Sequence, residues 1–129
     1  MNIVIAGSRD FIDYQLLSKA VQRIINKFYK DETITIVSGC ARGADKLGEM
    51  FAINNNYDVI KKPAKWHIHG RSAGYIRNTE MANIGDVLIA FWDMKSPGTR
   101  NMITLANKYN LQVFVIDIEK KKIIQSYIV

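Results

Sequence analysis

The chain has 129 residues, of which 48% are hydrophobic and 10% aromatic, a composition that fits one compact domain over residues 1–129 and excludes a disordered segment. Its 18 Lys and Arg residues exceed its 12 Asp and Glu residues, and the net charge of +6 favours anionic partners such as nucleotides, nucleic acid or phosphorylated metabolites. One cysteine excludes a disulfide framework. No apolar run approaches the ~20 residues of a membrane span, and no signal-peptide pattern is present. We therefore expect a cytoplasmic protein.

The first half of the chain alternates between strand-like and helix-like patterns. Residues 2–7 form a continuous apolar run that predicts a buried central strand, and the three- and four-residue spacing after Asp13 predicts an amphipathic helix that Asp13 caps. Residues 33–39 predict the next strand and residues 44–55 the next helix. The side chains of this helix expected to face the sheet include Leu47, Met50 and Phe51.

The second half continues the alternation. We expect a strand over residues 57–64, a polar and aromatic loop over 65–72 and a helix over 73–84. A strand over 86–92, a turn-rich loop over 93–98, a helix over 99–109 and a strand over 111–118 follow. Residues 118–129 are interpreted as an extra hairpin strand or an arm.

This alternation predicts the fold class. Strands that alternate with helices of ten or more residues indicate βαβ units with right-handed crossovers. We therefore expect an α/β, Rossmann-like three-layer domain, with a mostly parallel sheet of about five main strands and helices on both faces. In such sheets the ligand lies beyond the carboxyl ends of the strands, so function should reside in the loops that follow them.

Two of these loops lead into helices through glycine. Gly39 and Gly43 let the backbone turn tightly, and the helix that follows would present N–H groups and the positive end of its dipole to a phosphate. Gly98 and Thr99, in SPGTRN, repeat the device, with Thr99 as the predicted helix cap. An ordinary tight turn is the alternative at both places. Of four arginines able to hold phosphate, we expect two to contact ligand: Arg9, Arg42, Arg77 and Arg100.

Four motifs in order, GSRDF, IVSGCARGAD, PAKW with AGYIRNTEM, and LIAFWDMKSPGTRNMI, resemble the YspA/cpYpsA-related branch of the SLOG superfamily from about Ile3 to Val115. The resemblance implies a Rossmann-like fold and a nucleotide or nucleotide-derived ligand. Relatives include Lonely Guy phosphoribohydrolases, the DNA-processing protein A family and sensors of nucleotide second messengers, such as cyclic nucleotides, in antiphage defence. The implied site consists of Gly7, Ser8, Arg9, Ser38, Gly39, Arg42, Gly43, Asp45, Arg77, Asn78, Gly98 and Thr99.

Two positions depart from the family pattern. Lonely Guy enzymes pair an arginine, which Arg77 resembles, with a glutamate whose position falls here on Met102, and this argues against hydrolysis by that route. Cys40 stands where this branch more often has glycine. We interpret it as a small residue filling a turn; a reactive thiol near a helix N-terminus is the alternative.

Weaker candidates lie near the predicted site. A general base could be found among Asp45, Glu49, Glu80 and Asp93, with helix capping or loop ordering as the other interpretation. His67 and His69 form an H-x-H pattern without an obvious third ligand, so no metal and no cofactor is expected. Trp66 in its polar loop is a better candidate for stacking on a base than Trp92, which we expect to be partly in the core.

Three functions stay open, in this order. The first is binding of a nucleotide-derived signal, with sequestration of that signal if the chain comes from a phage. The many Ile, Lys and Asn residues are typical of an AT-rich coding sequence, as in a low-GC bacterium or one of its phages. The second is a nucleotide N-glycoside or phosphate hydrolase that uses Arg77 with Asp45, Glu49 or Asp93. The third is single-stranded nucleic-acid binding. The resemblance also implies a homo-oligomer.

Overall fold

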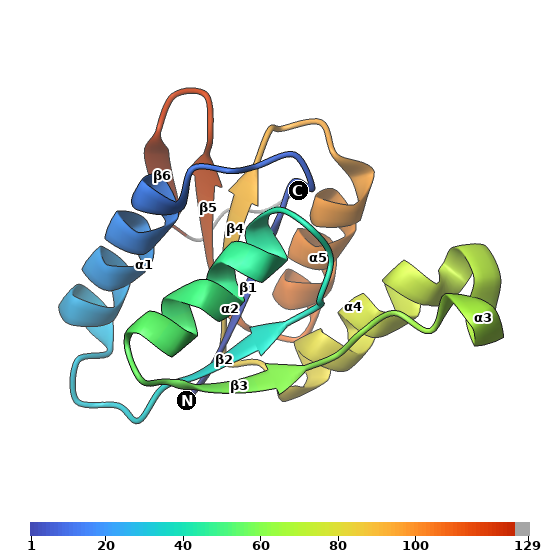
Figure 1. The fold of residues 1–129 in the computed structure, drawn as a ribbon, viewed down its shortest axis with the longest axis horizontal. Helices are drawn as coiled ribbons and strands as arrows, with labels where there is room; N and C mark the ends of the chain where they lie inside the picture. Colours follow the sequence, from blue (N-terminus) through green and yellow to red (C-terminus); the bar gives the residue numbers. More distant parts are fainter. Residues whose placement is uncertain (126–129) are drawn as a thin grey trace.

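A computed structural model of the chain describes residues 1–125, and these form one six-stranded sheet with helices on both faces (Figure 1). The strand order is β3-β2-β1-β4-β5-β6, with β1 to β5 parallel and β6 antiparallel to β5. The strands are β1 Asn2–Gly7, β2 Thr35–Ser38, β3 Asp58–Lys61, β4 Val87–Trp92, β5 Gln112–Asp117 and β6 Lys122–Gln125. The α-helices are α1 Tyr14–Phe28, α2 Ala44–Asn54, α3 Trp66–His69, α4 Ala73–Ile84 and α5 Pro97–Lys108.

The expected α/β, Rossmann-like three-layer arrangement is confirmed, with six strands rather than five. The additional strand is β6, whose four residues pair with β5 in a hairpin. For residues 122–125 the tail is therefore a strand and not an arm, and residues 126–129 lie outside the described part of the chain. Within residues 1–125, no helix is both long enough and apolar enough to span a membrane.

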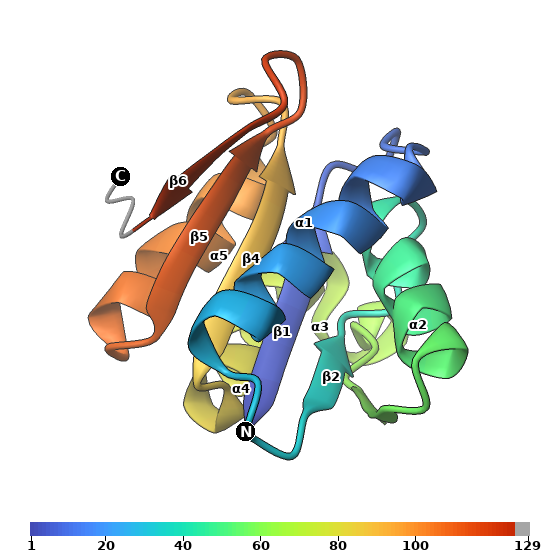
Figure 2. The ribbon, with the colours of Figure 1, turned by 90° about the vertical axis from the view of Figure 1, so that its left-hand side faces the viewer.

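Each face of the sheet carries its own hydrophobic core. Ile3 and Ile5 of β1 pack with buried side chains of α1 and α2, whereas Val4 and Ala6 pack with those of α4 and α5. Figure 2 shows α1 and α2 in front of the sheet and the other helices behind it. A central strand covered on both faces buries both sets of alternating side chains, which explains the continuous apolar run at residues 2–7.

The helices follow their predicted boundaries closely, but the prediction for one side chain that should face the sheet is wrong. Asp13 caps α1 as expected, because its Oδ1 accepts the Leu16 N–H at 3.0 Å. In α2, Phe51 is fully buried, but Met50 is 46% exposed, so its expected contact with the sheet is wrong. The weak apolar periodicity of this helix did not separate the two neighbours.

Two local expectations for the loops are also wrong. Residues 65–72 are not a loop: α3 and a 3₁₀ turn at Gly70–Ser72 form a segment that projects from the body beside α4 (Figure 1). Thr99 does not cap α5, because the helix begins at Pro97 with Ser96 in the cap position. Proline is suited to the first helical position since its φ is already helical and its missing N–H is not needed there.

The topology places a crevice between β1 and β4. The chain leaves β1 toward α1 on one face and leaves β4 toward α5 on the other, so the strand order reverses between these two neighbours. The loops that follow the two strands diverge at this point, which is where Rossmann-like sheets bind ligands.

Gly43 is required for the loop after β2 to lie against the loop after β1. Its φ is +82°, and a Cβ atom there would collide with the backbone carbonyls of Ser8 and Arg9. We expect Gly43→Ala to lower the free energy of unfolding by about 2–4 kcal/mol. Gly98→Ala is the control, because a Cβ at Gly98 meets nothing within 4 Å. Urea denaturation of both variants measures the difference; equal stability would contradict this account of the loop contact.

Candidate functional site

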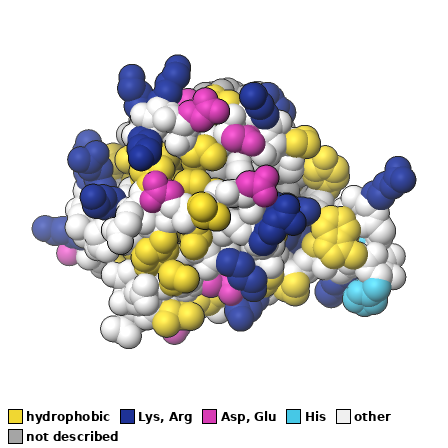
Figure 3. Space-filling view, turned by 45° about the horizontal axis from the view of Figure 1, so that its top comes forward, with side chains coloured by type: hydrophobic (Ala, Val, Ile, Leu, Met, Phe, Trp, Pro, Cys, Tyr) yellow, Lys and Arg dark blue, Asp and Glu magenta, His cyan; other side chains and the backbone are white. Residues whose placement is uncertain are grey.

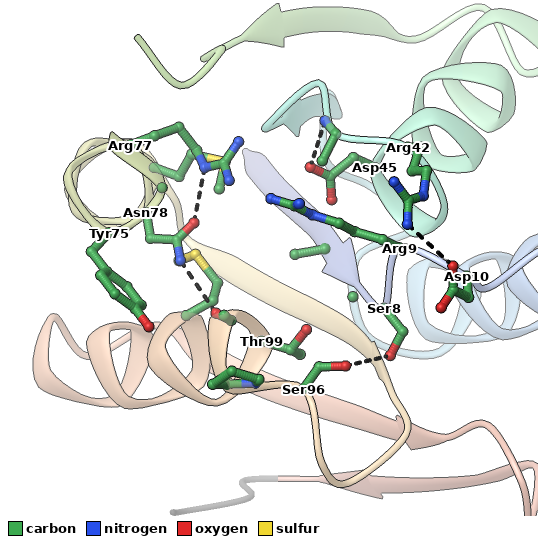
Figure 4. Close-up of a pocket in the computed structure, with 18 of the residues that line it drawn as sticks. Ser8, Arg9, Asp10, Arg42, Asp45, Tyr75, Arg77, Asn78, Ser96 and Thr99 are labelled. Atoms are coloured by element: carbon green, nitrogen blue, oxygen red, sulfur yellow. Dashed lines mark hydrogen bonds and ion pairs between the residues drawn. The ribbon is translucent and has the colours of Figure 1, made fainter. Parts of the chain in front are cut away.

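A cavity of about 470 Å³ opens in the crevice at the carboxyl ends of β1 and β4 (Figure 4). The loops after these strands form its floor, the start of α2 and the α4 helix form its sides, and the start of α5 closes one end. Among the residues predicted from sequence, those that line it are Gly7, Ser8, Arg9, Arg42, Asp45, Trp66, Arg77, Asn78, Gly98 and Thr99, together with Asp93.

The other predicted residues lie behind this lining. The Ser38 hydroxyl donates to Glu49 Oε2 at 2.6 Å and accepts the Cys40 N–H at 3.0 Å. Glu49 in turn forms ion pairs with Lys46 at 3.6 Å and Lys61 at 3.8 Å. Neither Ser38 nor Glu49 lines the cavity, and the contacts indicate that both support the loop after β2. Gly43, Gly39 and the exposed Glu80 also lie outside the cavity lining.

The guanidinium of Arg77 links α4 to the loop after β2. Its Nη1 donates to the backbone carbonyl of Gly39 in a short hydrogen bond, and its Nε donates to Asn78 Oδ1 at 3.0 Å. A Cβ atom on Gly39 would lie 2.6 Å from Arg77 Nη1 and 2.7 Å from Asp45 Oδ2. Only glycine therefore lets this cation and this carboxylate lie on either side of the loop.

Burial shifts the titration of both charged groups. Burial lowers the pKa of Arg77, opposed by the negative charge of Asp45 and reinforced by the positive charge of Arg9. Burial raises the pKa of Asp45 to about 6, against the opposing effects of the Ala41 N–H, which donates to Oδ2 at 3.1 Å, and of Arg77. The cavity thus contains a carboxyl group able to take up and release a proton near neutral pH.

The four candidate arginines have different surroundings. Arg9 extends toward Arg77 and Asp45 (Figure 4), and within residues 1–125 its guanidinium forms no hydrogen bond or ion pair. Arg42 points to Asp10 and pairs with it at 3.4 Å at the exposed rim. Arg100 lies outside the cavity, with its guanidinium 5.1 Å from the centre of the Trp92 ring. Figure 3 shows Lys and Arg side chains at the junction between the body and the projecting α3 segment.

Hydroxyl groups gather at the start of α5. Asp93 Oδ2 accepts the Ser96 hydroxyl at 2.9 Å, and Ser96 Oγ lies 3.4 Å from Ser8 Oγ. Burial alone would raise the pKa of Asp93, but hydrogen bonds from the Ser96 and Lys95 N–H groups and from the Ser96 hydroxyl lower it. Since the carboxylate engages Ser96, no side chain caps α5 within the described residues, and the positive end of the helix faces the cavity.

Asn78 fixes the distance between α4 and α5. Its Nδ2 donates to the Gly98 carbonyl at 3.3 Å and to Asn101 Oδ1 at 3.0 Å, while its Oδ1 accepts from Arg77. The same side chain therefore orients the guanidinium and the first turn of α5.

The start of α2 differs from that of α5. The Ala44 N–H donates to the Ser8 carbonyl at 3.3 Å, and the Ala41 N–H donates to Asp45, so two of the N–H groups expected to face a phosphate here have partners within the protein. Cys40 has a φ of +65°, which explains why glycine suits this position. Burial and the charge of Glu49 raise the pKa of its thiol, which argues against a reactive thiolate.

The tryptophan and histidine candidates differ in exposure and in their position relative to the cavity. Trp66 is 51% exposed at the cavity, whereas Trp92 is 1% exposed and lies wholly in the core, where we had expected it only in part. His67 and His69 are exposed on α3. No group of three or more His, Cys, Asp or Glu side chains within residues 1–125 could hold a metal ion.

Sequence reasoning missed several residues of the cavity wall. The sequence pattern predicts Ser96 in a turn-rich loop, whereas it occupies the cap position of α5, and its place directly before Pro97 is the signal for this. Arg71 and Tyr75 line the cavity from the segment mistaken for a loop and from the first turn of α4. Met102 also lines it and is 1% exposed, so a thioether forms part of the cavity wall.

The comparisons with known proteins cover most of the chain. The sequence model of the YspA, cpYpsA-related SLOG family matches residues 1–69. A protein of Mycobacterium phage D29, named Gene 61 protein, is 32% identical over 117 residues, which cover 86% of this chain and 92% of that protein. No solved structure matches the chain.

The raised pKa of Asp45 makes stability depend on pH. Between the unfolded value of 3.8 and the folded value of about 6, the folded protein holds a proton that the unfolded chain has released. The free energy of unfolding, relative to that of Asp45→Asn, should be highest below pH 4 and fall by up to about 3 kcal/mol as the pH rises through 6. Urea titrations of both proteins from pH 4 to 8 measure this, and a constant difference would contradict the assignment.

Proposed function

Because the chain belongs to the YspA, cpYpsA-related SLOG family, we propose that it binds a nucleotide or nucleotide-derived signalling molecule in the cavity between β1 and β4. Membership relates the chain to nucleotide binding or processing, and the earlier resemblance to this family is confirmed. The observation that carries the proposal is that the Arg9 guanidinium and the N-terminus of α5, which have no side-chain partner within residues 1–125, converge on one cavity. Both features favour an anion.

The lining indicates how a phosphorylated ligand would lie. The hydroxyls of Ser8 and Ser96 and the first turn of α5 offer hydrogen bonds to phosphate oxygens, with Arg9 opposite them. Trp66, half exposed, offers a flat surface for a base. In this proposal the loop after β2 mainly positions Arg77 and Asp45, since its Cys40 and Ala41 N–H groups already donate within the protein.

Binding without turnover is the form of the proposal that the cavity supports best. Met102 provides no proton and no negative charge to the cavity wall. The similar phage protein agrees with a phage-borne chain, and we propose that such a protein sequesters the nucleotide signal of a host defence.

Arg9→Ala should weaken nucleotide binding by roughly 10- to 100-fold, because it removes charge-assisted hydrogen bonds to phosphate. Isothermal titration calorimetry with the four ribonucleoside 5′-monophosphates and 5′-diphosphates measures the loss of affinity. Arg23→Ala is the matched control, since Arg23 is exposed on α1 and lines neither cavity described in this protein, yet its loss changes the net charge equally. Similar affinities for the two variants would contradict binding at this site.

Asp45 favours a second candidate function, hydrolysis of the N-glycosidic bond or of a phosphate ester. A carboxyl group with a pKa of about 6 beside Arg77 is suited to general acid–base catalysis. In this case the wild-type protein would release free base or inorganic phosphate, and Asp45→Asn would reduce the rate by about 100-fold or more while nucleotide affinity persists. Product analysis by liquid chromatography decides, and intact nucleotide after prolonged incubation would exclude this function for the compounds tested.

A further inference from the structure

A second cavity adjoins the first on the side of β3. Its volume is about 330 Å³, compared with about 470 Å³ for the main cavity. The residues that line both spaces are Arg9, Ala41, Arg42, Trp66 and Arg77. They form a shared boundary, so a single ligand can extend from one cavity into the other.

The two cavities differ in chemistry beyond this boundary. The main cavity carries the hydroxyls of Ser8, Ser96 and Thr99. The second is closed by Gly39, Cys40, Pro63 and Ala64, which are small or flat and carry no charge, since the raised pKa of the Cys40 thiol keeps it neutral. Such walls suit the face of a heteroaromatic ring better than a phosphate group.

The boundary itself is cationic and aromatic. Arg9 has no partner within residues 1–125, and the Arg42–Asp10 pair is weak because the two side chains are 72% and 94% exposed. Trp66 and Arg77 both line this boundary, and atoms of both side chains lie within 4 Å of the position that a Cβ atom on Gly74 would take. A phosphate at this boundary would therefore have flat or polar compartments on both sides.

We propose that the ligand has two nucleoside halves joined through phosphate, with one half in each cavity and the linking phosphate at the arginine boundary. This rests on the proposed function, because it assumes that the main cavity holds a nucleotide. The volume of the main cavity alone lies within the range of sites for one small ligand, so a mononucleotide would leave the second cavity empty. Because Trp66 lines both cavities, the first base contacts it from the main cavity, and the second base packs against it from the second cavity, together with Pro63 and Ala64.

The test compares ligands of one and two nucleosides on the full chain. The probes are the four ribonucleoside 5′-monophosphates and the linear dinucleotides pApA, pGpG, pCpC and pUpU, titrated by calorimetry. Ala64→Phe reduces the volume of the second cavity alone, since Ala64 lines only that space. Ile68→Phe is the control, because Ile68 is 63% exposed on α3 and lines neither cavity. Ala64→Leu replaces the larger substitution if thermal denaturation shows that Ala64→Phe does not fold.

The wild-type protein should bind at least one dinucleotide about tenfold or more tightly than its mononucleotide, the gain expected from stacking one additional base. Ala64→Phe should remove this advantage and leave mononucleotide affinity unchanged, while Ile68→Phe should bind both as the wild type does. Equal affinity for the two ligand classes, or an equal loss of both in Ala64→Phe, would overturn the two-nucleoside assignment and leave the proposed function intact. Failure of every probe to bind would overturn both.

Discussion

The buried guanidinium of Arg77 joins three parts of the chain that lie far apart in sequence. It donates hydrogen bonds to the carbonyl of Gly39 after β2 and to Asn78 Oδ1 on α4. Asn78 in turn donates to the carbonyl of Gly98, which connects the guanidinium to the start of α5. Its charge is removed from water, and the nearby carboxylate of Asp45 offsets part of that cost. If this cation moved, the hydrogen bonds that hold the loop after β2 and the first turn of α5 in place relative to α4 would be lost.

Several features of the site follow from that constraint. Gly39 has to be glycine because the guanidinium and the Asp45 carboxylate occupy the space of its side chain. Because Asp45 is held beside Arg77 at the start of α2, negative charge already occupies this helix end, and the Ala41 and Ala44 N–H groups have partners. Within residues 1–125, Arg9 forms no hydrogen bond or ion pair and no side chain caps α5, so both can receive an anion. Arg9 extends toward Asp45 and Arg77, whereas the N-terminus of α5 lies at the end of the cavity formed by Ser96 and Thr99 (Figure 4), so an anion can be held between the two.

Much of this architecture can be predicted from the sequence, because buried parallel strands are continuous apolar runs and the helices that cover them are amphipathic. The edge at which the polar residues gather follows from the same alternation. Side-chain partnerships could not be predicted: nothing in the sequence shows that Ser38 is bound to Glu49 behind the loop, or that Asp93 engages Ser96 and leaves α5 uncapped. The short α3 segment was missed because four residues rich in histidine and tryptophan carry no helical periodicity.

The most direct test of the central claim is to ask what the protein retains. Purified protein would be incubated with nucleoside monophosphates, dinucleotides, cyclic dinucleotides and cyclic ADP-ribose forms, separated from free compounds, denatured, and both fractions analysed by mass spectrometry. The account predicts that an intact nucleotide is recovered with the wild-type protein and is depleted in Arg9→Ala. A protein fraction without any nucleotide would contradict it.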